Sequence, residues 1–150
     1  MPEVVKMQSP FALLTLGEDV RIEEGRKYSM IGVPMGPYDA PEYPITFPKF
    51  VLNVQYFERP NESDLPIEVR VYLPGEAEPV VVQQVDTKAL RMQAPADDPE
   101  ADDPFLGVGA FIVLAPMVIK GPGRLRVRFY RGDLEIRAGS HLFRAPSGQN

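Results

Sequence analysis

The chain has 150 residues, 44% of them hydrophobic and 25% charged, which predicts a single globular domain, residues 1–150, with one core. It contains no cysteine, so disulfides, zinc–thiolate sites, iron–sulfur clusters and cysteine nucleophiles are excluded. The formal net charge is −5, which disfavours nucleic acid as a ligand unless a local basic face exists.

The N-terminal half begins with alternating apolar patterns. Residues 11–16 (FALLTL) form a short apolar run that predicts a strand. Residues 18–24 and 27–33 alternate around Gly25, which can adopt the positive φ of a tight reversal, so they predict a hairpin. Residues 34–48 contain five prolines, which exclude a helix and predict an irregular connection whose aromatic side chains pin it to the core.

The middle of the chain carries the strongest strand signals. Residues 50–58 (FVLNVQYFE) are rich in β-branched and aromatic residues. Residues 67–73 alternate, with apolar positions on one side and Glu68, Arg70 and Tyr72 on the other. A strand over residues 80–85 follows a Pro-Gly turn, and residues 86–93 are the one segment that favours a short helix.

The last third returns to strand patterns. Residues 105–119 predict one long or two short strands, bent near Pro116, and the G-x-G within them indicates a close backbone approach or a bulge rather than a phosphate loop. Residues 124–131 and 134–143 alternate around a tight turn, and residues 145–150 are expected to fray. The whole pattern predicts an all-β protein, an antiparallel two-sheet β-sandwich of about eight or nine strands, with a barrel as the alternative.

No targeting or membrane segment is recognisable. The N-terminus lacks a basic segment followed by a long apolar one, so no signal peptide is predicted. The longest apolar run, residues 105–119, is interrupted by two glycines and a proline and is shorter than the roughly 20 residues that cross a bilayer. We therefore predict a soluble cytoplasmic protein that does not associate with membranes.

Three segments resemble a known family: "EDVRIEEGRKYSMIGV", "YPITFPKFVLNVQYF" and "LEIRAGSHLF". They are similar to a family of small β-rich proteins of unknown function from bacteria and phages. The likeness covers roughly the first 60 residues and is weaker beyond them. The positions that carry it are Asp19, Gly25, Lys27, Ser29, Ile31, Gly32, Val33, Pro44 and Pro48. The resemblance implies one β-rich domain and brings no catalytic residue.

Five acids lie within seven residues of the segment "QAPADDPEADDPF", namely Asp97, Asp98, Glu100, Asp102 and Asp103. Calcium binds six to eight oxygens in a loop that wraps one point, and this segment supplies the charge but contains three stiffening prolines and no EF-hand pattern. We interpret residues 94–104 as an exposed, hydrated acidic loop, with calcium binding or docking to a basic partner as alternatives.

Arg124, Arg126 and Arg128 alternate along one strand and therefore share a face. Such a stripe can bind phosphate groups or nucleic acid, with Tyr72 or Tyr130 available for stacking. Three further arginines are expected nearby: Arg131, Arg137 and Arg144.

The structural interpretation of this arginine stripe is a solvent-facing sheet surface. Glu68 and Glu135 are expected as cross-strand partners, and arginines also protect a sheet from edge-to-edge aggregation. The acidic loop could also fold over the stripe, with each surface ion pair contributing less than about 1 kcal/mol.

Catalytic residues are not recognisable. His141 is the single histidine, and Asp133 is the acid that could assist it, but no spacing of a known triad is present. The sequence therefore favours a non-enzymatic binding or protein-interaction module of bacterial or phage origin. A calcium-dependent binding module and a hydrolase are the alternatives. No cofactor or bound metal is predicted, and the expected partner is another protein or, since sandwich edges invite pairing, a second copy of the chain.

Overall fold

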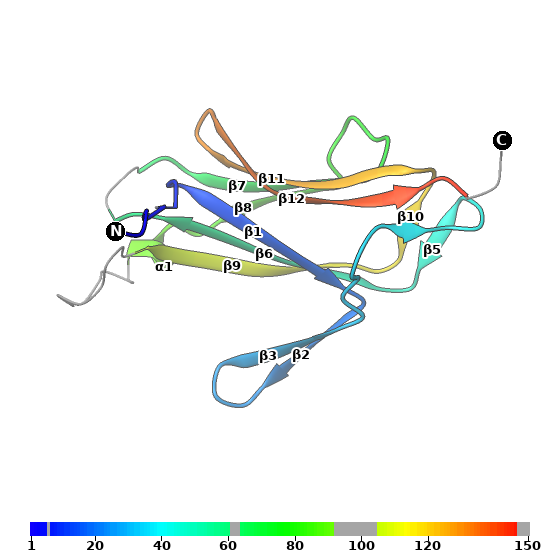
Figure 1. Ribbon diagram of the computed structural model, residues 1–150, viewed down its shortest axis with the longest axis horizontal. Coiled ribbons are helices and arrows are strands. Elements are labelled where there is room, and N and C mark those ends of the chain that lie inside the picture. Colours follow the sequence, from blue (N-terminus) through cyan, green and yellow to red (C-terminus); the bar gives the residue numbers. More distant parts are fainter. Residues whose placement is uncertain (6, 61–63, 92–104, 147–150) are drawn as a thin grey trace.

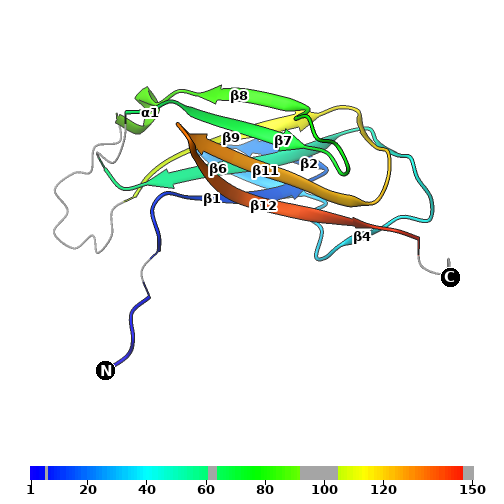
Figure 2. The ribbon, with the colours of Figure 1, turned by 90° about the horizontal axis from the view of Figure 1, so that it is seen from above.

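The computed structural model describes residues 1–5, 7–60, 64–91 and 105–146. Two sheets stack face to face in it, as Figures 1 and 2 show. One sheet has three strands, in the order β1 (Phe11–Gly17), β6 (Phe50–Glu58) and β9 (Leu106–Leu114). The other has five strands, in the order β4 (Tyr38–Asp39), β12 (Leu134–Arg144), β11 (Gly123–Arg131), β7 (Ile67–Tyr72) and β8 (Val81–Val85). The prediction of an all-β antiparallel sandwich is confirmed.

Two small sheets accompany the sandwich. In one, β5 (Ile45–Phe47) pairs with β10 (Met117–Ile119); in the other, β2 (Asp19–Glu23) pairs with β3 (Lys27–Ile31). The predicted helix over residues 86–93 is one turn, α1 (Lys88–Arg91). Within the described part of the chain, no helix is long and apolar enough to cross a membrane.

The core lies between the two large sheets and follows the alternation of the sequence. Along β7, Ile67, Val69 and Val71 are fully buried, while the residues between them are half-buried on the opposite side. The same pattern runs along β11, where Leu125, Val127 and Phe129 face inward. Burial of these apolar side chains supplies the main stabilising free energy of the sandwich.

One side of the sandwich is closed where β1 meets β12. A Cβ atom at Gly139 would lie 3.2 Å from the Leu14 side chain, so glycine allows the two strands to approach closely. On the other side, Phe57 covers Gly107, whose added Cβ would lie 2.7 Å from the Phe57 ring. At Gly109 an added Cβ would lie 3.2 Å from the Val54 carbonyl oxygen, which is the close backbone approach that was one of the two alternatives predicted for the G-x-G segment.

The proline-rich connection, residues 34–48, is more regular than the sequence indicates. The prediction of an irregular link is wrong at two points, because β4 pairs in parallel with β12 and β5 pairs with β10. Tyr38 and Phe47 pack edge to face with ring centroids 5.4 Å apart. The Tyr43 hydroxyl donates a hydrogen bond of 2.6 Å to the Arg144 carbonyl, so the aromatics hold this link to the core as predicted.

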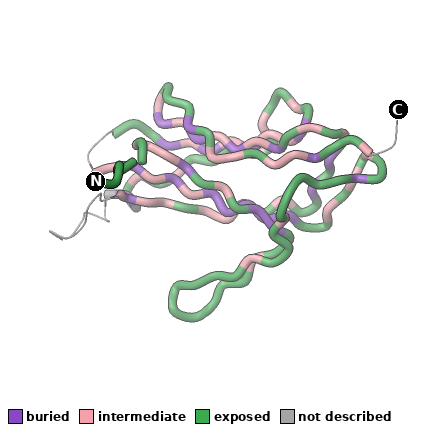
Figure 3. The backbone as a smooth tube through the Cα atoms, viewed as in Figure 1, coloured by how far each residue is buried: buried purple, intermediate pink, exposed green. Residues whose placement is uncertain are grey.

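The predicted hairpin forms as β2 and β3 but projects from the sandwich, as Figure 1 shows. Gly25 and Arg26 both have positive φ at its turn, at 76° and 59°. Figure 3 shows that most of this hairpin is exposed. Its Tyr28 ring contacts Phe111 of β9 with centroids 5.1 Å apart. The Asn53 side-chain amide also donates a 2.7 Å hydrogen bond to the Tyr28 hydroxyl, which fixes the hairpin to β6.

Candidate functional site

The outer face of the five-stranded sheet carries the arginine stripe. Arg124, Arg126 and Arg128 alternate with the buried residues of β11, as the sequence predicts, and therefore point away from the core. Because β11 lies between β7 and β12, outward side chains from three strands meet on this surface. We call it the arginine face, and it consists of Glu68, Arg70, Tyr72, Arg124, Arg126, Arg128, Tyr130, Glu135 and Arg137.

Two arginines of this face stack on tyrosines. The Arg70 guanidinium lies over the Tyr130 ring, 4.3 Å from its centroid, and Arg126 lies over Tyr72 at 4.8 Å. Arg70 also donates a hydrogen bond to Glu68, and this bond is the main reason that the pKa of Arg70 is raised above its usual value. Cation–π contacts and the ion pair hold these side chains flat against the sheet.

Arg128 sits deeper in the face than its neighbours. It forms an ion pair with Glu135 at 3.2 Å and donates hydrogen bonds to the carbonyls of Val127 and Gly139. Burial, reinforced by the nearby charge of Arg137, lowers the pKa of Arg128. Glu135 also forms an ion pair with Arg137 at 3.8 Å, so one carboxylate pairs with two arginines that lie opposite each other on β11 and β12.

The arginine face has an excess of positive charge, because it contains five arginines and two glutamates. Guanidinium groups bind carboxylates and phosphates through paired hydrogen bonds. The hollow at one end of the face, lined by Pro66, Glu68, Arg70 and others, measures about 120 Å³. Small-molecule sites usually measure about 300–1,000 Å³. The arrangement therefore suits the surface of a macromolecule better than a small ligand.

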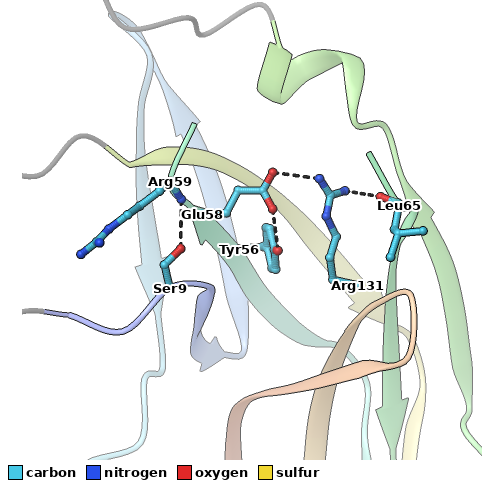
Figure 4. Close-up of polar contacts among 6 residues, drawn as sticks. All are labelled: Ser9, Tyr56, Glu58, Arg59, Leu65 and Arg131. Carbon is cyan, nitrogen blue, oxygen red and sulfur yellow. Dashed lines mark hydrogen bonds and ion pairs between the residues drawn. The ribbon is translucent and has the colours of Figure 1, made fainter. Parts of the chain in front are cut away.

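Two arginines predicted near the stripe lie elsewhere. Arg131 points into the sandwich, where its guanidinium contacts the buried Glu58 carboxylate at 2.9 Å and the Leu65 carbonyl (Figure 4). Arg144 lies beyond the face and pairs with Asp39 at 2.6 Å. The prediction that these two extend the stripe is wrong, whereas Arg137 does belong to it. Arg131 occupies an odd-numbered position of β11, like the inward residues of that strand, whereas the outward arginines occupy even-numbered positions. The alternation in the sequence therefore already distinguishes Arg131 from them.

The acidic stretch, Asp97, Asp98, Glu100, Asp102 and Asp103, lies outside the described residues. The structure describes residues on both sides of this stretch: Leu90 of α1 is buried in the core, and the Phe105 ring packs edge to face on Phe11. Among the residues that the structure describes, no cluster of three histidine or acidic side chains is arranged to hold a metal ion. Calcium binding stays an alternative inferred from the sequence.

His141 and Asp133 are not brought together. Asp133 precedes the first residue of β12, and His141 is near the other end of that strand, seven residues after its start. At about 3.3 Å per residue, the two are roughly 20 Å or more apart. His141 packs edge to face on Phe143 and borders a hollow of about 230 Å³ with Leu14 and Ser140. Burial lowers the pKa of His141.

The sequence did not identify Arg70 as a neighbour of the stripe, although it did so for Arg137. Alternation placed Arg70 on the outer side of its strand, but only the strand order β12–β11–β7 brings it beside Tyr130. Comparisons with protein-family models, with curated proteins and with solved structures found no match. The fold and the arginine face therefore carry the functional argument.

Proposed function

We propose that this protein is a non-enzymatic interaction module whose arginine face binds an acidic surface of another protein. The excess of five arginines over two glutamates on one sheet surface carries this proposal. Such a surface attracts an acidic partner and orients it through guanidinium–carboxylate pairs. The cysteine-free composition agrees with a reducing, cytoplasmic setting, and the family resemblance of the sequence suggests a bacterial or phage origin.

A protein partner fits this face better than nucleic acid does. Proteins that bind single strands stack bases on exposed aromatic rings. Here Tyr72 and Tyr130 are each covered by an arginine of the same face. The two glutamates also interrupt the positive surface, and the chain as a whole carries a net charge of −5.

Two labelled probes test the proposal by fluorescence anisotropy, an oligoglutamate peptide and a single-stranded DNA of equal charge. The double variant Arg124→Gln/Arg126→Gln should weaken binding of the peptide about three- to tenfold, since each exposed ion pair contributes a fraction of 1 kcal/mol up to about 1 kcal/mol. The matched control is Arg21→Gln/Arg26→Gln, which removes the same charge from the projecting hairpin.

Equal weakening in the control would show that only the overall charge matters, and the arginine face would lose its role. Tighter binding of the DNA than of the peptide, lost in the face variant alone, would replace the protein partner with nucleic acid.

A further inference from the structure

The side of the sandwich opposite the β1–β12 contact is bordered by two edge strands, β8 and β9, which lie along the same side in Figure 2. Neither strand contains a charged residue or a proline. Natural sheets usually protect such edges with lysine, proline or bulges, because the unpaired N–H and C=O groups of an edge are a template for another strand. Both edges here lack that protection in their sequence.

The core is also incompletely covered along β9. Val108, Ala110 and Leu114 point inward and pack against the core, yet they are only half-buried. The other two inward residues of β9, Leu106 and Ile112, are buried, as are the inward residues of β6. Half-buried apolar side chains next to an uncharged edge are the pattern of a surface that another strand covers.

The outer face of the same sheet contains no charged side chain on any of its three strands. Its members are Phe11, Leu13, Thr15, Gly17, Val51, Asn53, Gln55, Phe57, Gly107, Gly109, Phe111 and Val113. A strand added beside β9 therefore meets uncharged neighbours on both faces. A second copy of β9 suits this position, because it has the same length as the edge, contains no charged residue and is largely apolar.

We propose that two copies of this chain pair along β9, antiparallel and centred on Ala110, to form one continuous six-stranded sheet. This inference is independent of the arginine face. The proposed centre is the middle residue of β9, so the two copies pair symmetrically about it. Helix α1 also contacts β9.

Side-chain sizes match in that register. On the outer face, Gly107 of one copy lies opposite Val113 of the other, and Gly109 lies opposite Phe111. On the inner face, Leu106 lies opposite Leu114. Each glycine thus meets a large side chain, an arrangement that fills the space beside an edge glycine without a collision.

Charge also agrees with antiparallel pairing. The five acids at 97–103 precede the start of β9, so two parallel copies would place ten like charges at one end. Antiparallel pairing separates the two starts of β9 by about 30 Å, taking roughly 3.4 Å per residue over the strand.

Two other uncharged surfaces, the edge of β8 and the outer face of the three-stranded sheet, are weaker candidates for contact between two copies. β8 has five residues against nine in β9, and two of them are glutamines. Stacking of the outer faces is hindered by the hairpin, because Tyr28 covers part of this surface at Phe111 and Asn53.

Light scattering after gel filtration measures the mass directly, and a wild-type dimer has twice the 16.7 kDa of one chain. Val113→Lys places a charge on the β9 edge, and we expect it to raise the dimer dissociation constant about tenfold. Leu13→Lys is the matched control: Leu13 lies on the same outer face but on the opposite edge strand, and it is 47% exposed against 49% for Val113. Val82→Lys places the same charge on β8.

The proposed centre has its own test. Ala110→Lys and Ala110→Glu each place like charges opposite one another across the two-fold axis, so each variant alone should be monomeric. A mixture of the two should recover the dimer. Thermal melting checks that every variant is folded, and the exposed position Val113 decides the question if the Ala110 variants are not.

Three results overturn the proposal. A monomeric wild type at about 100 μM excludes a dimer of ordinary affinity and leaves the edge to a strand from another protein. Equal weakening by Leu13→Lys would assign the contact to stacked outer faces. Weakening by Val82→Lys alone would assign it to β8.

Discussion

At the residue scale, Glu58 joins the two sheets through charge. Its carboxylate lies on β6, contacts the Arg131 guanidinium of β11 at 2.9 Å and accepts a 2.8 Å hydrogen bond from the Tyr56 hydroxyl (Figure 4). Both ionic side chains are 5% exposed. An ion pair this deep is costly to separate, because each charge alone would remain in a medium of low polarity. The pair therefore fixes the position of one sheet relative to the other.

Glu58→Gln should therefore lower the free energy of unfolding by about 3 kcal/mol, the lower end of the range for a broken buried pair. Urea denaturation measures this loss. The control is Asp39→Asn, which breaks the exposed pair with Arg144 and should cost far less than the loss of the buried pair. Similar losses in the two variants would contradict a special role for the buried pair.

We expect His141 to make stability depend on pH. Burial lowers its pKa in the folded protein, so between the folded and unfolded pKa values the unfolded chain binds more protons. The melting temperature should therefore fall as the pH drops below about 6.5, the ordinary histidine pKa. His141→Gln should remove this part of the pH dependence, measured as the difference in melting temperature between pH 7.5 and pH 5.5. A variant with the same pH dependence as the wild type would show that the carboxylates dominate this range.

At the element scale, the hairpin β2–β3 depends on its attachment to β6 and β9. A two-stranded hairpin alone is marginally stable in water. Tyr28→Ala removes both the ring contact with Phe111 and the acceptor of the buried Asn53 amide. We expect faster hydrogen exchange over residues 19–31, with protection of β7 and β11 unchanged. Ile22→Ala, at a side chain that is 70% exposed, should leave exchange unaltered. Slow exchange in Tyr28→Ala would mean that the hairpin is stable by itself.

The positions of most strands could be predicted from local sequence patterns, whereas the pairing between strands could not. Phe50–Glu58 matches the predicted segment because five of its nine residues are β-branched or aromatic and favour a strand. The short strands β4 and β5 were missed, since each exists only through pairing with β12 or β10, far along the chain. For the same reason, alternation revealed the outward arginines of β11, whereas the stacking of Arg70 on Tyr130 required the strand order.

At the scale of the whole molecule, the two proposals combine into a geometric consequence. Antiparallel strands in one sheet keep the same side chains on the same face, so the two-fold axis of a β9 dimer is perpendicular to that sheet. The arginine face lies on the far surface of the second sheet of each sandwich, with its residues directed away from the core. Both arginine faces of such a dimer point in the same direction and can contact one acidic surface together.

Bivalent contact predicts a dependence on ligand density that monovalent binding lacks. When a second site binds within the same complex, the effective concentration is set by geometry and dissociation becomes slower. On a sensor surface, wild-type protein should leave densely immobilised oligoglutamate at least about tenfold more slowly than sparse oligoglutamate. Val113→Lys should lose this difference and retain the sparse-surface affinity, because its substitution lies on β9, away from the arginine face. Arg124→Gln/Arg126→Gln should do the reverse, binding weakly at both densities while remaining dimeric. Equal dissociation rates of the wild type at the two densities, in a protein that light scattering shows to be dimeric, would mean that the two faces cannot engage one surface.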